Sequence, residues 1–177
     1  MIYMVDHIFD DASLEPGWHE HYASYLLKLL AVPGLTTAQR FKALDHTPPR
    51  FLAMYSVDSP GIYESPAYKA MGGGGSQSAR FHAAYKMWTR NLLDGVEFAP
   101  EVKRNQFVLT VDSELPDPAL DLAFPGKVLW LSSVGLHQTT PYRALVILDP
   151  GEEAKARALN RGFVYATFTD FLVAPPR

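Results

Sequence analysis

The chain has 177 residues, of which 47% are hydrophobic and 12% aromatic, and this suits one domain or two small fused ones with a substantial core. Its net charge of -3 comes from interspersed acids and bases, so we expect no nucleic-acid-binding face. The lack of cysteine excludes disulfides, thiol nucleophiles and cysteine-ligated metals.

The first residues, MIYMVDHIFDDASLEPG, have neither a basic region nor an apolar run of the length found in export signals. No segment of the sequence approaches the ~20 consecutive apolar residues of a membrane span. We therefore expect a cytoplasmic protein that makes no membrane contact.

A strand and a long helix are predicted first. Ile2 to Phe9 mixes β-branched and aromatic residues and ends at a polar turn, which indicates a strand with His7 near its end. A helix then runs from Glu15-Pro16-Gly17 to the stop signal at Pro33-Gly34.

One face of this helix is aromatic. Its buried stripe recurs at helical spacing and consists of Trp18, Tyr22, Tyr25 and Leu29. His21 lies beside Tyr25, so the stripe is more polar near its start than a plain core requires.

A hairpin and a less regular segment follow. Leu35 to Leu44 and Arg50 to Val57 are predicted strands, and Ile62 to Met71 is a predicted short helix. The four glycines at 72 to 75 predict a mobile connection, either a plain linker or a gate beside a ligand site.

A second helix is predicted from Ser78, because apolar side chains recur at helical spacing: Phe81, Tyr85, Trp88 and Leu92. Val96 to Lys103 is predicted as the next strand, with Pro100 placing it at an edge or a bulge.

The rest of the chain resembles the first part with its long helix removed. The predicted strands are Phe107 to Asp112, Lys127 to Leu136, Tyr142 to Leu148 and Phe163 to Ala174, and the predicted helix is Gly151 to Asn160. Pro116, Pro118 and Pro125 leave room for about one helical turn before the second of these strands.

The two parts are related in sequence. Leu29 to Ser56 aligns with Asp121 to Leu148 at a constant offset, with Pro33-Gly34 matching Pro125-Gly126. The identities include turn residues, which interchange less readily than aliphatic ones. We interpret the chain as a duplicated α+β unit, with a first repeat at 1-104 and a second, degenerate repeat at 105-177.

The first repeat carries the residues of a family resemblance. Its β-α-β-β-α-β order, the helix end LLAVPG and the run PPRFLAMYSVDSP leading to SPAYKAM resemble the EthD-like branch of the dimeric α+β barrel (ferredoxin-like) superfamily. The resemblance implies an α+β fold in which two ferredoxin-like units pair through their sheets, with small apolar ligands between sheet and helices. One chain would supply both units here, and further association into a homodimer is an open alternative.

The chain departs from the family at one position. Many EthD-like sequences have a histidine nine residues before the glycine of the Pro-Gly stop, and Tyr25 stands there in this chain. An aromatic pair that precedes this histidine is replaced by Glu20 and His21. Chemistry that relies on the family histidine is therefore not transferred, and we hypothesise that His21 takes an acid-base role.

Candidate site residues follow from the first repeat, because only this repeat has a helix long enough to enclose a ligand. The predicted catalytic residues are His21, Tyr25 and His7, since imidazole titrates near neutral pH and side chains at i, i+4 can share a hydrogen bond. The predicted substrate-binding residues are Trp18, Tyr22, Arg40, Tyr85 and Trp88.

Each assignment has a structural alternative. His21 could be a partly exposed residue beside a core tyrosine, His7 a solvent-facing turn residue, and the four rings plain core. Arg40 could form a surface pair across strands. His137, near the turn of the second repeat, is predicted to be solvated and outside the site.

No metal or cofactor is expected. His19-Glu20-His21 places its imidazoles at i, i+2, on different sides of a helix, and glycines 72 to 75 match no phosphate-binding loop.

The predicted function is a cofactor-independent enzyme, of isomerase, lyase, cyclase or oxygenase type, that acts by proton transfer on a small hydrophobic, aromatic or oxygenated substrate. The alternatives are a non-catalytic binder of a small apolar ligand and a heme-related EthD-like protein.

Overall fold

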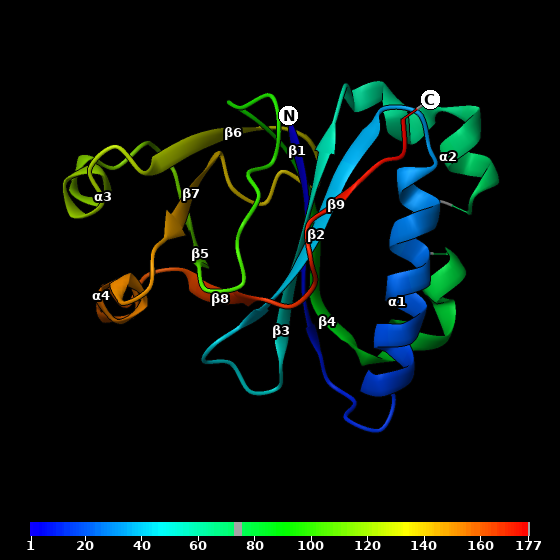
Figure 1. Cartoon of the computed structure of the whole chain (residues 1–177), viewed down its shortest axis with the longest axis horizontal. Coiled ribbons are helices and arrows are strands. Elements are labelled where there is room, and N and C mark those ends of the chain that lie inside the picture. Colours follow the sequence, from blue (N-terminus) through cyan, green and yellow to red (C-terminus); the bar gives the residue numbers. More distant parts are fainter. Residues whose placement is uncertain (73–75, 177) are drawn as a thin grey trace.

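A computed structural model describes residues 1–72 and 76–176 and shows a mixed α+β fold (Figure 1). Antiparallel strands close into a barrel, because β3 at one end of the strand order also pairs with β2 near the other. The strands of the barrel are β1 (Ile2–Phe9), β2 (Leu35–Ala43), β3 (Arg50–Val57), β4 (Tyr85–Asp94), β5 (Phe107–Ser113), β6 (Val128–Leu136), β7 (Tyr142–Leu148) and β8 (Phe163–Thr167).

Both halves of the barrel have the ferredoxin-like strand order. The first half runs β4-β1-β3-β2, and the second runs β8-β5-β7-β6 in the same sense. Two antiparallel seams join the halves, one between β4 and β6 and one between β8 and β2. The short β9 (Leu172–Val173) pairs with β2 beyond β8. The predicted α+β barrel within one chain is therefore confirmed.

Only the first half carries a long helix. Helix α1 (Glu15–Leu30) has a proline in its first turn, and the chain turns after it at Gly34, whose φ of 89° suits glycine. It lies along one side of the barrel in Figure 1. In the second half α3 (Pro118–Ala123) has six residues, which confirms the loss of most of that helix. The remaining helices are α2 (Pro66–Ala70) and α4 (Glu152–Ala158).

The predicted helix from Ser78 is wrong. The segment Ser76–Ala84 is a 3-10 helix, and β4 then begins at Tyr85. The predicted strand from Val96 to Lys103 is also wrong, since this segment is an irregular connection. The side chain of Gln39 holds this connection, because its Oε1 accepts a hydrogen bond from the Val102 amide at 3.1 Å.

The predicted strand Phe163 to Ala174 is interrupted. It divides into β8 and β9, because the amides of Phe168 and Thr169 turn aside to donate to the carbonyl of Arg40. The predicted mobile connection at glycines 72 to 75 falls mainly on residues 73–75, which lie outside the described residues. Over the described ranges, no helix combines the length and the apolar character that crossing a membrane demands.

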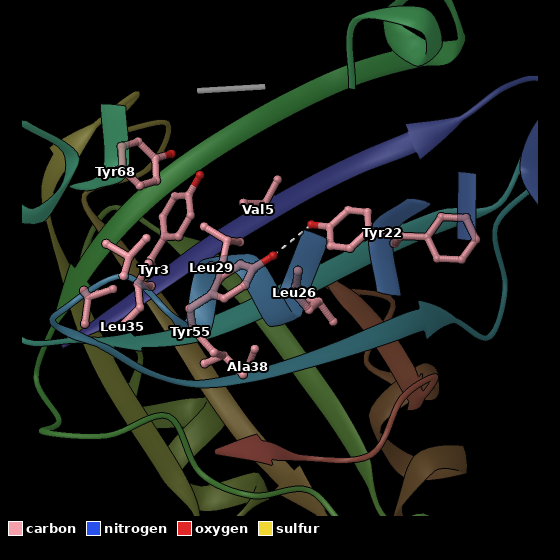
Figure 2. Close-up of a cluster of buried hydrophobic side chains, with 14 of the residues drawn as sticks. Tyr3, Val5, Tyr22, Leu26, Leu29, Leu35, Ala38, Tyr55 and Tyr68 are labelled. Carbon is pink, nitrogen blue, oxygen red and sulfur yellow. Dashed lines mark hydrogen bonds between the residues drawn. The ribbon is translucent and has the colours of Figure 1, made fainter. Parts of the chain in front are cut away.

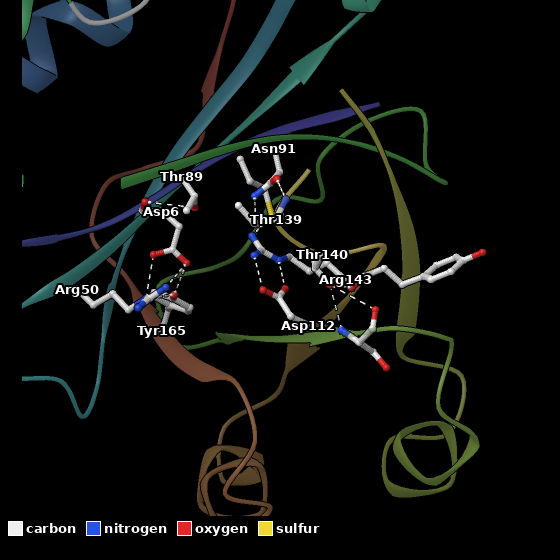
Figure 3. A network of polar contacts seen from close by, with 12 residues as sticks. Asp6, Arg50, Thr89, Asn91, Asp112, Thr139, Thr140, Arg143 and Tyr165 are labelled. Atoms are coloured by element: carbon white, nitrogen blue, oxygen red, sulfur yellow. Dashed lines mark hydrogen bonds and ion pairs between the residues drawn. The ribbon is translucent and has the colours of Figure 1, made fainter. Parts of the chain in front are cut away.

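Charged residues inside the barrel connect the two halves (Figure 3). Arg50 lies 2.9 Å from the Asp6 carboxylate, and the hydroxyl of Tyr165 from the second half donates to the same carboxylate at 3.1 Å. In the second half, Arg143 pairs with Asp112, with Nη2 donating to Oδ2 at 2.9 Å. Asp112 is exposed, whereas Asp6, Arg50 and Arg143 are buried, and buried charges are tolerated when each is hydrogen-bonded to a partner.

Candidate functional site

A cavity of about 50 Å³ lies in the first half, between α1 and the sheet. Side chains that alternate along β1 face it, because residues two apart in a strand share a face. The lining consists of Tyr3, Val5, His7, His21, Tyr22, Tyr25, Leu29, Tyr55, Tyr68, Ser78, Tyr85, Trp88 and Arg90. Six of the eight predicted site residues are therefore brought together: His7, His21, Tyr22, Tyr25, Tyr85 and Trp88.

A β-bulge in β4 turns three of these side chains toward the cavity. The pairing between β1 and β4 shifts between Asp6 and Ile8, so two residues of β4 oppose His7. One of them, Met87, has a φ of 50°, and its side chain points to solvent. The extra residue reverses the alternation, so Tyr85, Trp88 and Arg90 line the same cavity.

The cavity is unusually rich in phenols. Six of the nine tyrosines in the chain line it. The hydroxyls of Tyr22 and Tyr55 lie 3.0 Å apart. A dashed line marks this hydrogen bond in Figure 2. Burial raises the pKa of both phenols and that of Tyr25. They therefore stay protonated at neutral pH, and the cavity offers several neutral hydroxyl groups as hydrogen-bond donors.

His7 is the most deeply buried histidine on the cavity wall, with a relative exposure of 2%. Its ring packs edge-on against Trp18 and Tyr85, at centroid distances of 5.3 and 5.0 Å. Neither ring nitrogen has a hydrogen-bond partner among the described residues. The alternative of a solvent-facing turn residue is therefore wrong, because His7 lies inside β1 rather than after it.

The electrostatics of His7 favour the neutral ring. Burial, followed by the charges of Arg40 and Arg50, lowers its pKa to about 3. At neutral pH the imidazole is thus uncharged, and it is a weak base. A neutral imidazole still has one N–H donor and one acceptor nitrogen, so His7 can bind an oxygen of a ligand.

His21 and Tyr25 lie at the rim of the cavity, both partly exposed. Their rings are stacked, with centroids 6.1 Å apart and an interplanar angle of 16°, instead of sharing the predicted hydrogen bond. Burial, then the charges of Arg80 and Lys28, lowers the pKa of His21. The ring is therefore neutral at pH 7 and able to accept a proton.

Trp18 and Arg40 lie behind the wall rather than on it. Trp18 is fully buried, and its indole N–H donates to the Tyr85 hydroxyl at 2.9 Å. The guanidinium of Arg40 lies 3.8 Å from the centroid of the Tyr22 ring and has a relative exposure of 2%. The predicted surface pair for Arg40 is therefore wrong, because aromatic faces replace a carboxylate as its partner.

Sequence reasoning missed Arg90. Its guanidinium lies 4.8 Å from the centroid of the Trp88 ring, and its Nε has no hydrogen-bond partner among the described residues. None of the ion pairs formed by the described residues includes it. The cavity therefore has an uncompensated positive charge at its edge.

Arg90 and His7 line the same cavity. Arg90 pairs with Val5 in the β1–β4 register, and Val5 lies two residues from His7 on the same face of β1. The alternation of Trp88, Arg90 and Leu92 would have predicted this placement had β4 been identified as a strand. The cavity also has Tyr3, Tyr55, Tyr68 and Ser78 on its wall, which the sequence did not single out.

The second half has a different cavity, of about 270 Å³, which is lined mainly by residues 156 to 164 and, in the described part of the chain, has no long helix over it. The indole N–H of Trp130 donates a hydrogen bond to Asp121 of α3 at 3.0 Å, so this side chain already has a partner within the second half. Within the described ranges, no three histidine or acidic side chains gather as metal ligands.

The barrel and the helix-covered cavity define the fold of the dimeric α+β barrel proteins, built here within a single chain. None of the models of known protein families matches the chain, and neither does any curated protein. Solved structures do match.

An anthrone oxidase-like protein superposes with a TM-score of 0.61 at 14% identity, over 99% of this chain and 94% of its own. A provisionally assigned monooxygenase from Fusobacterium nucleatum has a TM-score of 0.55 at 10% identity, over 99% and 98% of the two chains. A second such monooxygenase, from Lactobacillus acidophilus, has a TM-score of 0.52 at 8% identity, over 98% and 99%. At these identities the likeness establishes the fold.

Proposed function

We propose that the protein is an oxygenase-type enzyme that binds a small aromatic, oxygenated substrate in the cavity of the first half and needs no cofactor. One observation carries this proposal: a buried His7 with two unbonded ring nitrogens shares a phenol-lined cavity with the uncompensated charge of Arg90. Such a cavity suits a flat aromatic molecule with an oxygen that becomes negative during the reaction. The names of two kinds of structural neighbour, anthrone oxidase-like and monooxygenase, support the reaction type.

The proposed chemistry begins with loss of a proton from an activated carbon of the substrate. His21 accepts this proton at the rim, while Arg90 and neutral His7 donate hydrogen bonds to the oxygen that gains the negative charge. The resulting electron-rich carbanion reduces dioxygen and combines with it to form a carbon-bound hydroperoxide. Loss of water from the hydroperoxide then converts a CH₂ group into a carbonyl, so one dioxygen yields one product oxygen and one water.

Substrate entry requires movement at the rim. A volume of about 50 Å³ holds only a few water molecules, whereas an aromatic ring needs more space. Trp88 and Tyr25 are partly exposed and border the opening, so their rotation would enlarge it. Side-chain changes of this size are common when ligands bind.

Oxygen consumption with anthrone and hydroxylated anthrones tests this function. We expect the purified protein to consume oxygen without added metal or flavin, and Arg90→Gln to lower kcat/KM by about 100-fold or more, as loss of an oxyanion donor does. Arg104→Gln is the matched control, because Arg104 forms an exposed ion pair with Asp170. Tight binding of anthrones without oxygen consumption would instead assign the chain to the non-catalytic binders.

We also propose that the chain arose by tandem duplication of an EthD-like unit. The support is local and structural: Gly34 and Gly126 both have left-handed backbones, with φ of 89° and 69°, and each follows a helix and precedes a strand. The two repeats would be residues 1-104 and 105-177.

A further inference from the structure

The second half contributes a side chain to the rim of the cavity in the first half. Strand β6 runs beside β4 and ends at Leu136, so the next residue, His137, lies against Arg90 and Trp88. We propose that His137 is a positioning residue that holds the Arg90 guanidinium ready for the anionic group of a ligand. This inference rests on the proposed function, in which Arg90 receives that group.

His137 contacts Arg90 along both its main chain and its side chain. The amide of His137 donates to the carbonyl of Arg90 at 2.9 Å, and the amide of Arg90 lies 3.3 Å from Nδ1 of the imidazole. The guanidinium Nη2 lies 3.5 Å from Nε2 of the same ring. The imidazole also stands edge-on to Trp88, at 5.8 Å and 86°, while the guanidinium lies 4.8 Å from the Trp88 centroid.

The turn that carries His137 is strained and clamped. Leu136 and Gln138 flank it with φ of 64° and 47°, a left-handed conformation that is unfavourable for a residue other than glycine. Asn91, which follows Arg90, is fully buried and holds the turn reciprocally: its Nδ2 donates to Thr139 Oγ1, and its Oδ1 accepts from the Thr139 amide, both at 2.9 Å. Strain that a buried clamp maintains is typical of functional positions.

An imidazole suits this task better than a carboxylate. An arginine side chain has many rotamers, so a fixed orientation improves binding only if something restrains it. A carboxylate would restrain the guanidinium but would also neutralise it. Burial and the charge of Arg90 lower the pKa of His137, which keeps the ring uncharged at neutral pH. A neutral imidazole has one acceptor nitrogen. In the tautomer whose Nε2 accepts from the guanidinium, His137 restrains Arg90 and leaves its positive charge for the ligand.

The test compares two ligands of the same shape, 2-naphthoate and 2-naphthamide, by titration calorimetry at pH 7.5. We expect wild-type protein to prefer the anion and Arg90→Gln to lose that preference, with about a tenfold or greater loss of naphthoate affinity. His137→Ala should weaken naphthoate binding about threefold to tenfold and leave naphthamide binding within about twofold. His137→Gln, whose amide oxygen can reach the position of Nε2 beside the guanidinium, should restore part of the loss.

A matched control and a double variant decide the outcome. His46→Ala removes the histidine of the corresponding turn in the first half, whose Nδ1 lies 2.7 Å from the carbonyl of Pro48, and it should change neither affinity. In the Arg90→Gln background His137→Ala should have no further effect, since the two residues act as one unit.

Two results would overturn the positioning role while leaving the proposed function intact. One is an additive loss of naphthoate affinity in the double variant, and the other is an equal loss of affinity for both ligands in His137→Ala. The same holds if His137→Ala keeps the full preference for the anion. If wild-type protein binds neither ligand, or Arg90→Gln keeps the preference, the proposed site fails and this inference fails with it.

Discussion

At the scale of single residues, His7 has the most consequential environment. Its two ring nitrogens enter the core of the first half without a partner in the described chain, between aromatic rings and near two arginine charges. An unbonded buried polar group costs about 1–3 kcal/mol. A protein that retains such a group at a cavity wall gives up stability there, and a ligand oxygen that bonds the ring would recover it.

His7 should make the protein sensitive to acid. Its pKa is lowered from 6.5 to about 3, so below pH 6.5 the unfolded chain binds a proton that the folded chain does not. The free energy of unfolding should therefore fall by about 1.4 kcal/mol per pH unit from this group as the pH drops from 6.5 toward 3. In His7→Phe this contribution disappears, and urea unfolding at pH 7, 5.5 and 4.5 would show a shallower decline. An unchanged decline in His7→Phe, or the same change in His46→Gln, would contradict this account.

The sequence analysis located about half of the cavity wall but missed the charge of Arg90. The helical stripe of α1 and the position of His7 near the end of a predicted strand brought His21, Tyr25 and His7 into one prediction, because each pattern is local. Arg40 was predicted to bind substrate, with a surface pair as the alternative, since arginine is rarely buried without an acidic partner. Its burial depends on Trp18, Tyr22 and Phe168, which are distant in sequence and meet only in the folded chain.

At the scale of elements, β4 explains the main error of the sequence analysis. Tyr85, Trp88 and Leu92 are spaced like one face of a helix, and the bulge at Met87 places the same residues on one face of a strand. A bulge in a strand and a turn of helix give the same short pattern, so periodicity alone does not distinguish them. The other strands of the barrel have no such insertion at their centre, and six were predicted to within about two residues.

The left-handed backbone of Met87 gives a test of the bulge. Met87 is 67% exposed, so its replacement removes little packing. Met87→Gly should raise the free energy of unfolding by about 0.5–1 kcal/mol, because glycine adopts this φ without strain. Lys86→Gly, one residue earlier in the same strand and also exposed, should lower it by about 1 kcal/mol. Urea unfolding measures both, and a loss of stability in both variants would show that β4 has no bulge at this position.

At the scale of the whole molecule, the barrel is closed by two seams between halves that resemble each other in topology. The seam between β4 and β6 places His137 at Arg90, and the seam between β8 and β2 brings β8 beside Phe41. Without the second half, β4 and β2 would be open edges with unpaired backbone groups. Such edges bind other strands readily.

Separation of the halves should therefore produce association. We expect residues 1–104, produced alone, to form a homodimer in which β4 of one copy pairs with β2 of the other, as the two halves do in the intact chain. Sedimentation equilibrium would measure the mass, and addition of residues 105–177 should convert the homodimer into a complex of the two fragments. A fragment that folds stably as a monomer would contradict the dependence of each half on the other.

The single long helix has a further consequence for how the protein responds to ligand and to mutation. A barrel made of two identical subunits carries every residue twice, so it has two equivalent cavities and a spare copy of each contact. Within residues 1–72 and 76–176 α1 is the one long α-helix, and we therefore expect one helix-covered cavity of the kind described. Saturation should follow a simple hyperbola with one ligand per chain. A damaging substitution in this cavity is therefore not masked by a second copy. The sequence of the second half is free to change wherever it does not contact the first half.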